Sequence, residues 1–264
     1  RERPGLLGLT GLLLSASSSV MSAEPPAREA PPQAGAPTAD SPAVVAPLFL
    51  HGKGRGAIGC MVVSPPVFLS EQDALSVIRE ELAKVGVQLG EGQAWNGTSI
   101  RPRRWKAMVE TKDSAWVHPY STPSILVEKM GFRKSDPQPI QVDAVDTARS
   151  IAVEYVAKED DEKYGVPDLG STARDYDLIE AARHLTRTVA MQKKGGTKFG
   201  AFYDPLVHFT GTWPEYKVNG KESTREEWQA RLREAYAPDL ARAKDLLRLQ
   251  VLDFIAWLKA QGAI

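Results

Sequence analysis

The sequence predicts an α+β protein: a mixed sheet of about five strands flanked by helices, with a helical C-terminal segment. Three patterns predict this fold class. Residues 140–155 alternate apolar and polar side chains with the period of two that is typical of strands. Residues 70–86 and 176–193 repeat apolar side chains every three or four positions, as amphipathic helices do. The same helical spacing runs through most of residues 223–262.

The N-terminal region has the pattern of an export signal. An apolar run over residues 5–20 follows two arginines, and the small residues Ser22 and Ala23 provide a cleavage site. The run ends in serines and is too short and too polar to cross about 30 Å of hydrocarbon. We therefore expect residues 1–23 to be a cleaved signal peptide that leaves no transmembrane anchor. The expected location is the periplasm or exterior of a bacterial cell.

The next segment, residues 24–46, is rich in proline and alanine and predicts a disordered linker. Residues 47–264 then have the length of a single α+β domain. Lysine plus arginine and aspartate plus glutamate both number 33, so the net charge gives no reason to expect a nucleic acid partner. The single cysteine, Cys60, lies among apolar residues, and we expect a buried and unreactive thiol.

The first half of the domain predicts one clear helix after a short strand. Residues 57–63 form an apolar run between glycines and prolines, which is typical of a short buried strand. Ser70 is a candidate N-cap for the helix over residues 70–86, and acidic residues follow it in the first turn. Gly86 provides a stop, because glycine tolerates the left-handed conformation that ends many helices.

The middle of the chain is less regular. Residues 90–123 have no sustained period and predict loops with one strand near residues 106–110, and residues 124–130 predict another strand. The alternation at residues 140–144 and again at 151–155 then predicts a hairpin. We expect one buried face on each hairpin strand. The opposite face, which carries Asp143 and Glu154, is expected to be partly solvated.

A helix over residues 176–193 follows the polar segment 158–174, and residues 198–203 predict the next strand. A strand, a helix and a strand in this order suggest a crossover unit with two parallel strands. In the C-terminal part, Ser223 and Glu226 have capping-box spacing, and Pro238 predicts the first turn of a second helix. The apolar stripe of that helix predicts packing onto the domain's own core, which favours a monomer over a dimer formed through it.

The segment after the strand at residues 198–203 provides the leading candidate site. Asp204 ends that strand and His208 follows four residues later, so polar groups gather where clefts in sheet proteins often open. A hydrolase would combine Asp204 and His208 with His118, and Tyr203 is a further candidate for ligand binding. The simpler alternatives are a turn begun by Asp204 and a half-buried His208 with one hydrogen bond.

Two other groups of polar residues deserve comparison with that segment. Asp160 and Asp161 belong to an acidic loop at residues 159–168 and are candidate ligand-binding residues, although the loop lacks the spacing of a calcium loop. A mobile, solvated loop is the favoured interpretation. Glu180 and His184 lie one helical turn apart, but this spacing alone does not predict a metal site. We therefore predict no metal site, and the sequence identifies no cofactor.

The sequence thus favours an exported binding or interaction module over an enzyme, because it contains no catalytic signature and carries a linker that spaces domains. The alternative is a hydrolase with a cleft around Asp204, His208 and His118. The two hypotheses differ in whether these residues converge in space.

Overall fold

The computed structural model describes residues 43–59, 64–100, 105–106, 133–134, 137–164, 173–193, 195–218 and 221–264. These segments all belong to one compact unit, residues 37–264. They form the α+β fold that the sequence predicts, with a mixed sheet and a helical C-terminal segment. The predicted signal peptide, most of the predicted linker, Cys60 and His118 lie outside the described residues.

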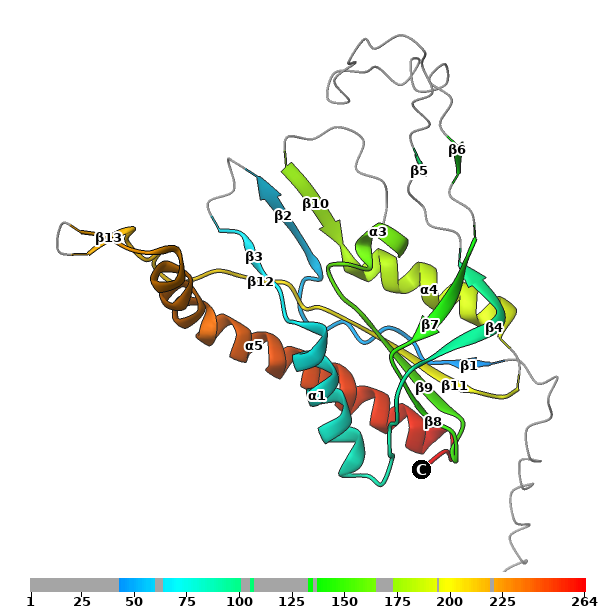
Figure 1. The fold of residues 1–264 in the computed structure, drawn as a ribbon. Coiled ribbons are helices and arrows are strands. Elements are labelled where there is room, and N and C mark those ends of the chain that lie inside the picture. The colour runs from blue at the N-terminus through cyan, green and yellow to red at the C-terminus, as the bar shows by residue number, and fades with distance from the viewer. Residues whose placement is uncertain are drawn as a thin grey trace, which may run out of the picture. The chain divides into compact units, whose positions relative to one another are not determined.

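A mixed sheet lies at the centre of this unit, with the strand order β1-β11-β9-β8 in the described part of the chain (Figure 1). The first three strands are parallel and β8 is antiparallel to β9. The antiparallel pair confirms the predicted hairpin turn, and Ser150 ends that turn with a φ of 53°. The four strands are β1 (Val44–Val45), β8 (Ala144–Asp146), β9 (Ile151–Val156) and β11 (Lys198–Tyr203).

The predicted crossover is also confirmed, because β9 and β11 are adjacent parallel strands and helix α4 (Leu178–Gln192) lies between them in the chain. The composition of residues 24–46 predicted a linker, yet Val44 and Val45 within that range form β1 beside β11. Two consecutive valines suit a strand because branched side chains pack well on a pleated surface. The central sheet therefore includes residues before 47, within the range predicted to be a linker.

Helices cover both faces of the sheet (Figure 1). Ala152 and Val156 of β9 share one apolar cluster with α4, whereas Ile151, Val153 and Tyr155 share another with α1 (Glu71–Ala83) and α5 (Arg225–Ala260). Every residue of β9 is consequently buried. The prediction that one face of this strand is solvated is wrong, and Glu154 is only 3% exposed. A strand covered on both faces loses the solvated face that a simple hairpin keeps.

The helix predicted at residues 70–86 is confirmed as α1. The Ser70 hydroxyl accepts the backbone N–H of Asp73 at 3.1 Å, so Ser70 is the N-cap. Gly86 has a φ of 81°, a conformation that strains other residues. The short helix α3 (Asp161–Tyr164) follows β9.

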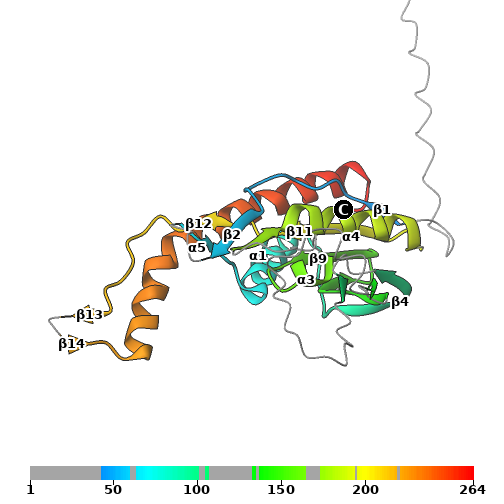
Figure 2. The same cartoon turned by 90° about the horizontal axis from the view of Figure 1, so that it is seen from above.

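The C-terminal helix begins one residue later than predicted and does not restart at its proline. Thr224 and Glu227, rather than Ser223 and Glu226, form the capping box of α5. Pro238 lies inside this single helix of 36 residues. Proline removes one backbone hydrogen bond and its ring clashes with the preceding turn, which kinks a helix. Figure 2 shows the change of direction along α5.

Five two-stranded pairs complete the described fold. The predicted strand at residues 57–63 begins at Arg55, and its described part is half-exposed rather than buried because it pairs with a single strand. Residues 93–100 were expected to be loops and form a strand. The strand predicted at residues 124–130 lies outside the described residues. The pairs are β2 (Arg55–Gly59) with β10 (Ala173–Asp177), β3 (Pro66–Val67) with β12 (Val207–His208), β4 (Gln93–Ile100) with β7 (Gln138–Val142), β5 (Trp105–Lys106) with β6 (Arg133–Lys134), and β13 (Lys217–Val218) with β14 (Lys221–Glu222).

Candidate functional site

Asp204 lies directly after β11, where the sequence placed the leading candidate. Its carboxylate is fully buried and accepts two backbone hydrogen bonds, from Leu69 N–H at 2.7 Å and from Leu206 N–H at 2.9 Å. Burial raises the pKa of Asp204 to about 6, and these two donors oppose the rise. The contact with Leu69 ties the end of the sheet to the segment that leads into α1, so Asp204 acts as an anchor between two parts of the fold.

His208 makes a different contact. It is half-buried in β12, and its Nδ1 lies 2.9 Å from the backbone oxygen of Ser64. This agrees with the simpler prediction of a packing histidine with one hydrogen bond. No hydrogen bond or ion pair joins Asp204 to His208 in the described part of the chain. The third member of the predicted hydrolase site, His118, lies outside that part.

The acidic segment at the end of β9 is more ordered than predicted. Asp160 and Asp161 are buried rather than solvated. The carboxylate of Asp160 accepts the Ala157 N–H at 3.0 Å and a hydrogen bond from Lys163 Nζ at 2.8 Å. A carboxylate of Asp161 lies 3.9 Å from the Arg174 guanidinium. These contacts hold the segment in place because a buried carboxylate needs donors or a counter-charge.

Two further carboxyl groups lie near Asp160. Asp143 accepts the Tyr155 N–H at 2.6 Å, and Glu154 accepts the Tyr164 hydroxyl at 3.4 Å. Burial raises the pKa of Asp143 to about 7 and the pKa of Glu154 well above its ordinary value, and the charges of Asp143 and Asp160 add to the shift of Glu154. Among the described residues, no group of three or more acidic, histidine or cysteine side chains is arranged to hold a metal ion.

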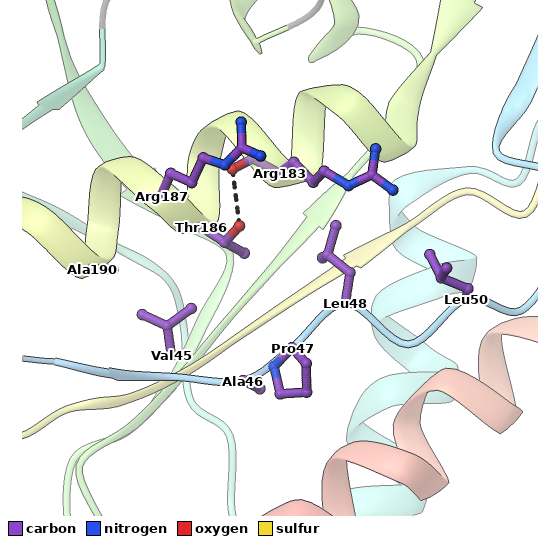
Figure 3. Close-up of a pocket in the computed structure, with 9 residues that line it drawn as sticks. All are labelled: Val45, Ala46, Pro47, Leu48, Leu50, Arg183, Thr186, Arg187 and Ala190. Carbon is purple, nitrogen blue, oxygen red and sulfur yellow. Dashed lines mark hydrogen bonds between the residues drawn. The ribbon is translucent and has the colours of Figure 1, made fainter.

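A groove of about 360 Å³ lies between α4 and the segment that continues from β1 (Figure 3). Its volume is within the range of small-molecule sites. The segment contributes apolar side chains, and α4 contributes two arginines spaced by four residues on one side of the helix. No acidic residue lines the groove. The lining residues are Val45, Ala46, Pro47, Leu48, Leu50, Arg183, Thr186, Arg187 and Ala190.

The two arginines of the groove differ in their contacts. Arg183 pairs with Glu180 at 3.3 Å, whereas Arg187 makes no hydrogen bond or ion pair with any described residue. The Thr186 hydroxyl donates to the Arg183 backbone oxygen at 3.0 Å, so it is already used within the helix (Figure 3). The guanidinium of Arg187 is therefore the polar group that remains available to a ligand.

Tyr203, a predicted ligand-binding residue, is buried and is not among the residues that line this groove. Gly54 leaves room for its ring, because a Cβ there would lie 2.8 Å from Tyr203 Cε2 and 2.5 Å from Ile179 Cγ1 of α4. The hydroxyl is buried and makes no hydrogen bond within the described part of the chain. Burial raises the pKa of Tyr203 to about 12, and the backbone of His51 and then the positive charge of Arg183 oppose this rise. A groove residue and a predicted residue thus lie close enough to interact electrostatically.

Sequence reasoning missed the groove itself. Val45 and Ala46 of one wall fall in the range assigned to the linker, and the other wall is a flank of α4. The signal that was present is the pair of arginines at positions i and i+4, which lie on one face of a helix without an acidic residue to pair with Arg187.

No family model, curated protein or solved structure matches this chain. Within the described segments, none of the helices combines the length and the apolar character needed to cross a membrane.

Proposed function

We propose that this protein is an exported binding module whose ligand occupies the groove between residues 45–50 and α4. The observation that carries the proposal is the groove itself: an apolar wall faces two arginines, and Arg187 has no partner among the described residues. An apolar pocket with a few polar groups is the usual form of a ligand site. The contacts of Asp204 and His208 with the backbone add no support for a hydrolase.

Ligand binding is tested by blocking the groove. Ala190 lines it and is exposed, so Ala190→Trp fills the groove without disturbing the core. A thermal-shift screen of small molecules is expected to find compounds that raise the melting temperature of the wild type and leave that of Ala190→Trp unchanged, because ligands stabilise the state that binds them. The matched control is Ala256→Trp at an exposed position of α5, which should respond like the wild type.

The proposal is contradicted if no compound stabilises the wild type, or if Ala190→Trp responds as strongly as the control. Export is tested separately by fusing residues 1–46 to alkaline phosphatase, an enzyme that is active only after export to an oxidising compartment. We expect activity from this fusion and none from a fusion that lacks residues 1–23.

A further inference from the structure

We infer that the ligand of this groove is an amphiphile, an aliphatic chain that ends in a single oxyanion such as a carboxylate or a phosphate. This inference rests on the proposed function and names the chemical class of the ligand. Three features of the described residues support it. These are the positive charge of the groove, the apolar side chains that line it, and the guanidinium of Arg187, which pairs with no described residue.

The charge of the groove is positive. Its lining residues include Arg183 and Arg187 and no acidic side chain, although the whole sequence has equal numbers of basic and acidic residues. Like charges spaced by four residues on a helix repel each other, and Arg183 is paired with Glu180 whereas Arg187 pairs with no described residue. An oxyanion beside Arg187 would relieve this repulsion and form charge-assisted hydrogen bonds with a planar guanidinium.

The opposite wall suits a hydrocarbon chain. Val45, Leu48 and Leu50 follow one another along the segment, and the side chain of Leu50 is 61% exposed. Met191 extends the helix side of the groove, since it lies one turn after Arg187, and it is 77% exposed. Exposed apolar side chains of this size gain free energy when a ligand covers them. Figure 3 shows Leu48 and Leu50 on the segment that faces the arginines.

The size of the groove suits a single small molecule. The arginines and the apolar side chains line one open groove of about 360 Å³, which is within the range of small-molecule sites.

The test compares ten-carbon amphiphiles that differ in their head group. Calorimetric titration of the full chain is expected to show binding of decanoate and decyl phosphate, and at least tenfold weaker binding of decyl maltoside and decyltrimethylammonium. Arg187→Gln should weaken decanoate binding about tenfold, because a hydrogen bond to a charged group is lost. The control Arg79→Gln, at an exposed site on α1, should leave it unchanged. Affinity should also rise about fourfold for each methylene from hexanoate to decanoate.

Three outcomes would overturn the inference. Neutral or cationic amphiphiles that bind as tightly as decanoate would show that the head group is not recognised. Decanoate binding that is equal in Arg187→Gln and Arg79→Gln would place the ligand elsewhere. Binding to vesicles of anionic phospholipid, weakened by Arg187→Gln and without binding of free decanoate, would assign the groove to a membrane. A further outcome separates this inference from the proposed function. If compounds from the thermal-shift screen bind the wild type but not Ala190→Trp, and decanoate does not bind the wild type, then the amphiphile inference is wrong and the proposed binding function is supported.

Discussion

The hydroxyl of Tyr164 in α3 lies 3.4 Å from Oε1 of Glu154, in the middle of a fully buried strand. The other carboxyl oxygen, Oε2, has no hydrogen-bond partner within the described residues. Burial is the main reason that the pKa of Glu154 lies well above its ordinary value of about 4.5. Between the ordinary pKa and the raised pKa, the folded protein therefore holds a proton on Glu154 that the unfolded chain releases.

The raised pKa of Glu154 predicts that Glu154→Gln stabilises the protein at pH 8 and has little effect at pH 4. Since the folded protein keeps the proton and the unfolded chain loses it, the stability of the wild type falls as pH rises above about 4.5. The fall is about 1.4 kcal/mol for each pH unit up to the folded pKa. Urea denaturation between pH 4 and pH 8 measures the difference between the two proteins.

The matched control is Glu91→Gln, because Glu91 is exposed. Its stability should follow that of the wild type at every pH. Parallel pH profiles for the wild type and Glu154→Gln would mean that Glu154 is ionised in the folded protein, contrary to the prediction.

A second prediction concerns the anchoring role of Asp204. Asp204→Asn keeps one oxygen acceptor but turns an amide N–H₂ toward a backbone donor, at Leu69 or at Leu206. We expect the free energy of unfolding at pH 7 to fall by about 1.5–3 kcal/mol, which is typical of a lost hydrogen bond to a charged group. Asp253→Asn is the control, since its pair with His51 is exposed and should contribute at most about 1 kcal/mol.

The same variant separates an anchor from a ligand-binding residue. If Asp204→Asn is as stable as the wild type and loses the ability to bind a ligand, Asp204 belongs to a binding site and its anchoring role is refuted. If stability falls and decanoate binding persists below the melting temperature, the anchor is supported.

A third prediction concerns the contact between β11 and α5. A Cβ at Gly200 would lie 2.7–3.0 Å from three carbon atoms of the Phe254 ring, which is closer than such atoms approach. Gly200→Ala should therefore destabilise the protein by about 1–3 kcal/mol through overpacking. Adding Phe254→Leu should reduce the penalty of the alanine, because a smaller side chain leaves room for the new methyl group.

A double-mutant cycle measured by urea denaturation checks this coupling. We expect the double variant to lose less free energy of unfolding than the sum of the losses in the two single variants. Additive effects would show that Gly200 and Phe254 do not compete for the same space.

The sequence predicted the regular parts of this fold because their signals are local. Ser70 caps α1 and Gly86 follows it as expected. The alternation at residues 140–144 and 151–155 predicted the hairpin, and the helix before residues 198–203 predicted the parallel crossover. Each of these features depends on neighbouring residues in the chain, which a single sequence contains.

The remaining features depend on residues that are distant in the chain. Glu154 looks solvated from its alternation and is buried because α4 and α3 cover its face of β9. Pro238 looks like a helix start and lies within α5, whose buried residues begin at Asp239. The groove requires residues 45–50 to lie against Arg183 and Arg187, about 140 positions away. No local pattern predicts such a contact.

The most direct test of the groove as the site for an anionic amphiphile is an NMR titration of methyl-labelled protein with decanoate. We expect saturable chemical-shift changes at the methyl groups of Leu48 and Leu50, which line the groove. Leu249 and Leu252 on α5 serve as internal controls, because they are 43% and 45% exposed and do not line the groove. Chemical-shift changes at Leu249 and Leu252, with none at Leu48 and Leu50, would show that decanoate does not bind in the groove.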